Sequence, residues 1–124
     1  MSKRILFIDD NLEITSLISK FLRLKNYDVT VINDSKTGSH HILNKKYDAI
    51  ILDISMPGIS GFDIIDSLVK QGKIKNQKII LLTAVELSKE DIKELLELGV
   101  YSCLLKPVEM NSLIYTIEGI PLSA

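Results

Sequence analysis

Five polar residues in this 124-residue sequence have the chemical types needed to bind a divalent cation and a charged oxygen group. They are Asp9, Asp10, Asp53, Thr83 and Lys106. Two carboxylates about 4 Å apart repel by roughly 4 kcal/mol at an effective dielectric of about 20, so three converging acids need a proton or a cation. A pocket of carboxylates without histidine or cysteine favours a hard ion, with Mg²⁺ foremost and Mn²⁺ as the alternative.

Each of these residues, taken alone, also has an ordinary structural explanation. A strand-end aspartate is commonly a helix cap or a turn residue, and a threonine hydroxyl such as that of Thr83 can also cap a helix. What favours chemistry is their shared position, because each one follows or ends an apolar segment of strand length.

Five short apolar segments alternate with five segments whose apolar residues have helical spacing. This alternation predicts an α/β domain with a parallel sheet and helices on both faces. In the strand order 2-1-3-4-5, a crevice opens between strands one and three, where open α/β sheets place their sites. The second strand, ending at Asn33 and Asp34, would stay at the edge, away from the cluster. The predicted strands are 5–8, 29–32, 49–52, 78–82 and 100–105.

Local signals predict where several helices begin and end. Asn11 is placed to cap the first helix, and residues 88–91, Ser-Lys-Glu-Asp, have the form of a capping box. Gly99 fits the end of the fourth helix, and Pro107 fits the first turn of the last one.

The composition fits one globular domain, with 46% hydrophobic and 25% charged residues. Cys103 is the one cysteine, which excludes a disulfide scaffold. The charges balance, with 15 Lys+Arg against 16 Asp+Glu, and this argues against direct nucleic-acid binding. The apolar runs are too short to span a bilayer, and the first residues do not form a signal peptide. We therefore expect a cytoplasmic protein without a nucleic-acid or membrane partner.

Four motifs, in this order and at this spacing, resemble the receiver domain of bacterial two-component response regulators. The resemblance covers essentially the whole chain and implies a flavodoxin-like, doubly wound (βα)5 fold. It implies a receiver domain over residues 1–120, with 121–124 as a tail or the start of a linker. The motifs are FIDDN at 7–11, ILDISMPGISG at 51–61, LTA at 82–84 and LLKP at 104–107.

The resemblance implies a phosphorylation switch with Asp53 as the acceptor. The phosphoryl group would come from a phosphohistidine on a sensor histidine kinase or a phosphotransfer protein. Mg²⁺ would be held by Asp9, Asp10, Asp53 and the backbone carbonyl of Ser55, with Asp10 as a direct ligand and Asp9 at least partly bound through water.

The resemblance also assigns roles in stabilising and removing the phosphoryl group. Lys106 and Thr83 would each bind a phosphoryl oxygen, because the transferred group spreads its charge over these oxygens. Ser55 and Val85, two residues after Asp53 and Thr83, would tune the rate at which water resets the switch. Such a domain promotes its own phosphorylation and dephosphorylation and is otherwise not an enzyme.

One residue departs from the family pattern. Three residues before the lysine the family usually has an aromatic residue or histidine, whose ring turns inward when the threonine moves. This chain has Cys103 there, which we interpret as a small buried hydrophobe rather than a redox group. Tyr101, two residues earlier on the same side of the strand, could replace the ring only if the strand end is unusual.

The resemblance implies signalling through a face formed by residues 88–118, toward a downstream effector protein or a missing output domain. The same face could also form a homodimer. Two other functions remain open: a receiver-like interaction module that works without phosphorylation, and a small phosphohydrolase of the haloacid dehalogenase type. The second is disfavoured because Ser55 stands where those enzymes carry a second aspartate.

Overall fold

Strands and α-helices alternate along the chain in the structure, a computed structural model that describes residues 2–121. Residues 122–124 of the predicted tail lie outside the described residues. None of the described helices has the length and apolar composition needed to cross a membrane. The elements are β1 (Arg4–Ile8), α1 (Leu12–Leu24), β2 (Asp28–Ile32), α2 (Ser35–Asn44), β3 (Ala49–Asp53), α3 (Gly61–Lys70), the 3-10 helix η1 (Ile74–Asn76), β4 (Ile79–Thr83), α4 (Lys89–Leu98), β5 (Ser102–Leu105) and α5 (Met110–Glu118).

The five strands form one sheet in the order β2-β1-β3-β4-β5, as predicted. All neighbouring strands pair in parallel. Strands β3 and β4 are buried along their whole length, which explains why they read as continuous apolar runs rather than as alternating patterns. The sheet therefore needs helices on both faces.

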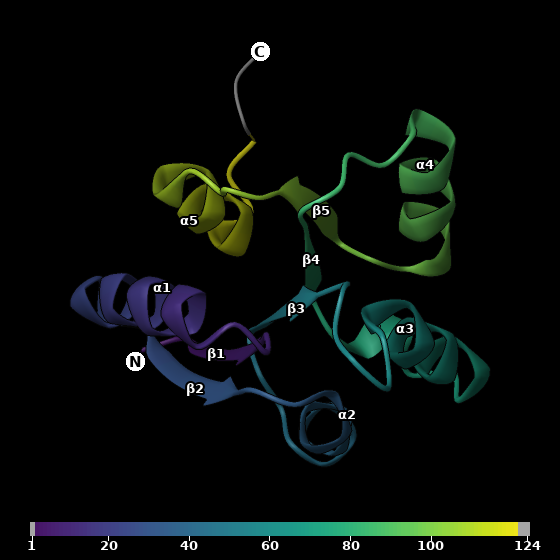
Figure 1. Cartoon of the computed structure of the whole chain (residues 1–124), viewed down its shortest axis with the longest axis horizontal. Helices are drawn as coiled ribbons and strands as arrows, with labels where there is room; N and C mark the ends of the chain where they lie inside the picture. Colours follow the sequence, from purple (N-terminus) through teal and green to yellow (C-terminus); the bar gives the residue numbers. More distant parts are fainter. Residues whose placement is uncertain (1, 122–124) are drawn as a thin grey trace.

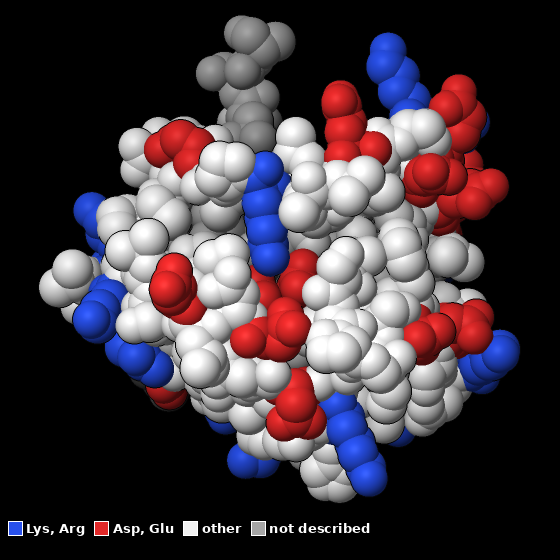
Figure 2. Space-filling model, viewed as in Figure 1, with Lys and Arg blue, Asp and Glu red and all other residues white. Residues whose placement is uncertain are grey.

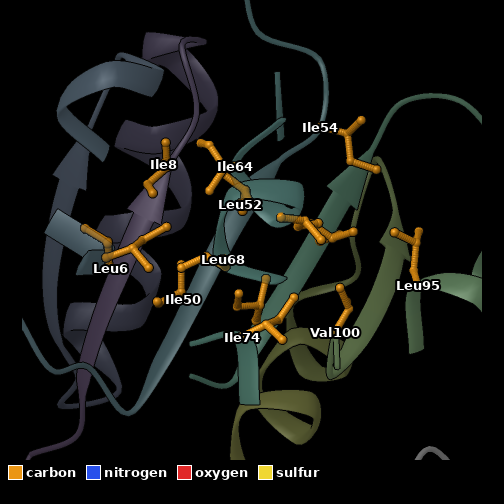
Figure 3. Close-up of a cluster of buried hydrophobic side chains, with 14 of the residues drawn as sticks. Leu6, Ile8, Ile50, Leu52, Ile54, Ile64, Leu68, Ile74, Leu95 and Val100 are labelled. Carbon is orange, nitrogen blue, oxygen red and sulfur yellow. The ribbon is translucent and has the colours of Figure 1, made fainter. Parts of the chain in front are cut away.

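Helices α1 and α5 cover one face of the sheet, and α2, α3 and α4 cover the other (Figure 1). Successive strand residues point to opposite faces, so Ile50 packs with the second group of helices and Ile51 with the first. Figure 3 shows the cluster on the α2–α4 face, which includes Leu6, Ile8, Ile50, Leu52, Ile64, Leu68 and Leu95.

Side-chain caps fix the beginnings of the helices. The Asn11 side chain accepts hydrogen bonds from the N–H groups of the first turn of α1, so the predicted cap is confirmed. Ser88 caps α4 by accepting from the Asp91 N–H. The complete reciprocal capping box lies instead at α3, between Ser60 and Asp63.

Two boundaries in the last third of the chain differ from the predictions. Strand β5 begins at Ser102 rather than at residue 100, because the Val100 N–H bonds to the Leu95 carbonyl in the turn that ends α4. The placement of Pro107 in the first turn of the last helix is wrong. Helix α5 begins at Met110, where the Glu109 side chain caps it, and the Lys106–Pro107 peptide bond is cis.

Two glycines allow helices to approach the sheet closely. A Cβ atom at Gly38 of α2 would lie 2.8 Å from the Ile8 side chain. A Cβ atom at Gly61, the first residue of α3, would lie 2.7 Å from the backbone carbonyl oxygen of Asp53. Backbone cannot rotate away as a side chain can, so Gly61 fixes α3 against the end of β3.

Candidate functional site

The parallel strands bring three carboxylates to one edge of the sheet. Asp53 is the last residue of β3, and Asp9 follows the neighbouring strand β1. Asp9 and Asp53 are only 0% and 3% exposed, whereas Asp10 is exposed to solvent. One carboxylate oxygen from each of the three lies within 4.8 Å of the others. Figure 2 shows acidic side chains gathered near the middle of the face of the molecule that it displays, beside an elongated basic side chain.

Lys106 joins this cluster from the far edge of the sheet. It follows β5, and its backbone N–H bonds to the Thr83 carbonyl at 2.7 Å, which holds it beside the end of β4. Its Nζ donates to Asp9 Oδ2 at 2.9 Å and lies 3.2 Å from Asp53 Oδ1. One ammonium group therefore pairs with two buried carboxylates.

The electrostatics of the cluster leave an excess of negative charge. Burial and the Asp9 charge raise the pKa of Asp53, while Lys106 and the Ser55 N–H oppose the rise. Burial works to lower the pKa of Lys106, but hydrogen bonds and attraction from Asp9 and Asp53 outweigh it, so that pKa lies above its usual value. Three carboxylates with one ammonium group and only oxygen donors suit a hard divalent cation.

Two asparagines hold the Asp9 segment in place. The Asn11 N–H donates to Asp9 Oδ1 at 3.0 Å. The Asn33 side-chain amide donates to the Asp9 carbonyl at 2.9 Å and to the Thr15 hydroxyl at 3.1 Å. The expectation that the end of β2 stays away from the site is therefore wrong for Asn33. The signal that could have found it is a polar residue at the end of the strand next to β1.

The Thr83 hydroxyl is bonded within its own loop rather than to the carboxylates. It donates to the Val85 carbonyl at 2.7 Å and accepts from the Val85 N–H at 3.0 Å. The Val85 side chain is 66% exposed, and Ser55 is exposed in the loop after β3. The structure therefore places Thr83 at the end of β4, with its hydroxyl hydrogen-bonded to the Val85 backbone as both donor and acceptor.

Cys103 lies half-buried on β5, where burial raises the pKa of its thiol. A raised thiol pKa disfavours the reactive thiolate and agrees with the apolar interpretation. Cys103 and Thr83 line a common pocket. Tyr101 is not among the lining residues of that pocket. Its ring lies under the Lys78 ammonium, 4.6 Å from ring centroid to Nζ, so it does not take the place of the missing ring.

Fold and site together define a class of α/β domain with an acidic, lysine-bearing pocket at the carboxyl ends of its strands. The family model of the response regulator receiver domain matches residues 5–118. The chain belongs to this family of receiver domains.

Relatives and solved structures agree with this assignment. The chain is 37% identical over 122 residues to the transcriptional regulatory protein CpxR homolog of Haemophilus influenzae, covering 97% of the chain and 50% of that protein. It is 34% identical over 119 residues to RprY of Bacteroides fragilis, covering 94% and 48%. The chain thus spans about half the length of these relatives.

Among solved structures, the receiver domain of the Francisella response regulator 1452 has a TM-score of 0.86 at 29% identity and covers 96% of each chain. The chemotaxis protein CheY4 of Vibrio cholerae has a TM-score of 0.83 at 26% identity, covering 98% of this chain and all of the other.

Proposed function

We propose that Asp53 is the phosphoacceptor of a two-component relay, and that a sensor histidine kinase or phosphotransfer protein donates the phosphoryl group. The observation that carries this proposal is the position of Lys106, whose ammonium lies between the buried carboxylates of Asp9 and Asp53. A fixed cation beside a buried carboxylate is what an attacking oxygen needs in order to approach a negatively charged phosphoryl group.

The reaction follows from this arrangement. A carboxylate oxygen of Asp53 attacks the phosphorus, and the bond from phosphorus to the donor's imidazole nitrogen breaks. Lys106 stabilises one phosphoryl oxygen, and Thr83 stabilises another when its hydroxyl turns away from the Val85 carbonyl. Water later attacks the phosphorus of the acyl phosphate and releases inorganic phosphate, which restores the Asp53 carboxylate.

The acidic cluster would hold Mg²⁺, or Mn²⁺ in its place. Both Asp9 oxygens already accept hydrogen bonds, from Asn11 and from Lys106, whereas Asp10 is exposed. We therefore assign Asp10 as a direct ligand and Asp9 as bound partly through water, with Asp53 and the Ser55 carbonyl completing the set. The bound ion would neutralise charge on the phosphoryl oxygens.

Ser55 and Val85 would set how fast the switch resets. Both lie in loops that flank the acceptor, and both are exposed, so their side chains can control the approach of water. The domain would act on its own phosphoryl group without turning over an external substrate.

The output face in this proposal consists of α4, β5 and α5. It would contact a downstream effector or an output domain, and a homodimer through the same face is the alternative. The cytoplasmic location stays a prediction.

Incubation with acetyl phosphate and Mg²⁺, followed by intact-mass spectrometry, tests the proposal. The wild type should gain one phosphoryl group, and Asp53→Asn should gain none. Asp66→Asn, which removes an exposed carboxylate paired with Lys70 on α3, is the matched control and should behave as wild type. A wild type that stays unmodified would instead support a module that works without phosphorylation.

A further inference from the structure

A pocket of about 260 Å³ lies between the end of α2 and the 3-10 helix η1. The segments that form it lead into β3 and β4, so the pocket is at the amino ends of the strands whose carboxyl ends carry Asp53 and Thr83. Each of these strands has five residues, and at about 3.3 Å per residue the pocket lies roughly 16 Å from the acceptor site. This distance exceeds the Debye length of about 8 Å at physiological ionic strength, so exposed charges in the pocket are largely screened from the acceptor site.

Three lysine side chains line this pocket, and none of the described acidic side chains does. They are Lys45, Lys46 and Lys73, and all three are exposed. None of the three forms an ion pair within residues 2–121. The sequence around them explains this, because residues 35–47 and 67–85 contain no Asp or Glu.

The acidic residues nearest to these lysines in the sequence are already engaged elsewhere. Asp48 accepts a hydrogen bond from the Arg4 backbone N–H at 2.6 Å. Asp66 pairs with Lys70 at 3.0 Å. The three ammonium groups therefore share one pocket without an ion-pair partner in the described part of the chain, which leaves them free to bind an anion from outside.

Hydrogen bonds hold the two walls of the pocket together. The Gln77 side-chain amide donates to the Ile42 carbonyl at 3.2 Å and so ties the η1 segment to the last turn of α2. Lys45 is the C-cap of α2, a position where a cation is favourable in its own right. Lys73 comes from the other wall, so a helix end does not account for the meeting of the lysines. The Asn76 side chain also lines the pocket and makes no hydrogen bond with a described residue, so its amide is available as a further donor.

Volume and charge together define the ligand that fits. A volume of about 260 Å³ is below the range of about 300–1,000 Å³ for drug-sized ligands, so the pocket suits a compact group. Lysine binds phosphate groups as a point charge. One phosphate group carries a charge of about −1.5 to −2 at pH 7, so two such groups, rather than one, balance three ammonium groups.

We propose that this pocket binds the diphosphate group of a small molecule. Lys45, Lys46 and Lys73 supply the positive charge, and the Asn76 amide supplies a neutral donor. A compact, concave site favours a small molecule over an extended polyanion such as nucleic acid. This site is additional to the proposed phosphoacceptor and does not depend on it.

Titration of isotope-labelled protein with inorganic pyrophosphate, followed through the amide chemical shifts, tests the proposal. EDTA is present throughout, so that no divalent cation carries pyrophosphate to the acidic cluster. The amide signals of residues 42–46 and 73–77 should shift and saturate, whereas chloride at matched ionic strength should give no saturating change. Orthophosphate should bind more weakly than pyrophosphate. Asp53→Asn should bind pyrophosphate as the wild type does.

Removing one ammonium group from the pocket should weaken binding by the amount that suits one exposed charge pair. Lys46→Gln and Lys73→Gln should each raise the Kd for pyrophosphate about two- to fivefold. Lys20→Gln on α1 is the matched control, because it removes the same charge from an exposed lysine outside the pocket, and it should keep the wild-type Kd.

Equal Kd values for Lys73→Gln and Lys20→Gln would overturn the proposal. Shifts that never saturate would mark an adventitious ion only, and shifts centred on residues 9–10 and 106 would place the anion at the acceptor site; either result would also overturn it. A short DNA duplex that binds more tightly than pyrophosphate would identify an extended polyanion surface, with the same consequence. None of these readouts involves phosphorylation of Asp53, so the proposed function is judged separately by the acetyl phosphate experiment.

Discussion

Lys106 differs from the other lysines in being mostly buried between two carboxylates. Its side chain is 16% exposed, against 76% for Lys70 in the i,i+4 pair with Asp66. Screening by water makes the exposed pair weak, whereas the Lys106 ammonium acts where screening is poor. The Lys106 charge therefore acts at short range on the carboxylates of both Asp9 and Asp53.

Replacing the Lys106 ammonium with an amide should slow phosphorylation of Asp53 strongly. We expect Lys106→Gln to reduce the initial rate with acetyl phosphate by about 100-fold, the effect of removing one preorganised donor. Time-resolved intact mass measures the rate, with Lys20→Gln on α1 as the control. A rate within twofold of wild type would show that Lys106 does not take part.

Asp53 should cost stability in the absence of metal. Its pKa is raised by burial and by Asp9, so the folded state holds the Asp53 proton more tightly than the unfolded state does. The contribution is favourable below the unfolded pKa and is lost as pH rises through the folded one. With chelator at neutral pH, Asp53→Asn should therefore unfold at a higher urea concentration than the wild type, and the difference should shrink on acidification. A stability difference between Asp53→Asn and the wild type that does not change with pH would contradict this.

The two helices that follow β3 and β4 are held differently against the sheet. Helix α3 buries Ile64, Ile65 and Leu68 and begins with the close contact of Gly61. Helix α4 buries only Leu95. The loop after β3 is therefore tied to a firmly packed helix, and the loop after β4 leads into a loosely packed one.

Two glycine substitutions separate backbone crowding from side-chain crowding. Gly61→Ala should lower the free energy of unfolding by about 3 kcal/mol, because the added methyl meets the Asp53 carbonyl. The methyl group added by Gly38→Ala meets the Ile8 side chain, which can shift more easily than backbone. The free energy of unfolding should therefore fall by only about 1 kcal/mol. Urea unfolding measures both, and the reverse order would contradict the geometry.

The sequence predicted the elements whose signals are local. Buried parallel strands read as apolar runs, and Asn11 caps α1 as its position suggests. The start of β5 was predicted too early, because Val100 is apolar but its N–H bonds back to α4. The start of α5 was also predicted too early, because a loop and the Glu109 cap lie between Pro107 and the helix. Both outcomes depend on local hydrogen bonds at a helix end rather than on the propensity of the residue itself.

The convergence of the acidic residues could be predicted, because a parallel sheet in the order 2-1-3-4-5 places the carboxyl ends of β1 and β3 side by side. The strand-end position of Asn33 marks it as a candidate, but its hydrogen bonds to Asp9 and Thr15 could not be predicted, since they depend on how the chain turns after β2. The hydrogen bonds of Thr83 with Val85 depend likewise on a loop conformation that no motif encodes.

For the molecule as a whole, a small polar cluster links the first strand to the last helix. Glu118 of α5 accepts hydrogen bonds from the Tyr27 hydroxyl and from Lys3, which precedes β1. These two bonds hold the pKa of Glu118 below its usual value, and the bond from Tyr27 has the larger effect. Residues distant in the sequence are thereby joined at one end of the domain.

This cluster should make stability depend on acid. A lowered pKa contributes stability above the unfolded value and loses it as pH falls through the folded value. Glu118→Gln should therefore cost about 0.5 kcal/mol at neutral pH, an amount suited to an exposed pair, and this cost should disappear as the pH falls through the lowered pKa of Glu118. Thermal unfolding across pH measures this, with Glu13→Gln on α1 as the control. A cost that persists in acid would contradict it.

The crowded contact at Gly61 also determines which parts of the molecule can shift. The carbonyl of Asp53 and the start of α3 are so close that neither can be displaced without the other. Across the site, the loop after β4 is bonded to the Thr83 hydroxyl at its start and leads to a helix with a single buried side chain. We therefore expect the β3 side to stay in place and the β4 side to move when a displacement begins at Asp53.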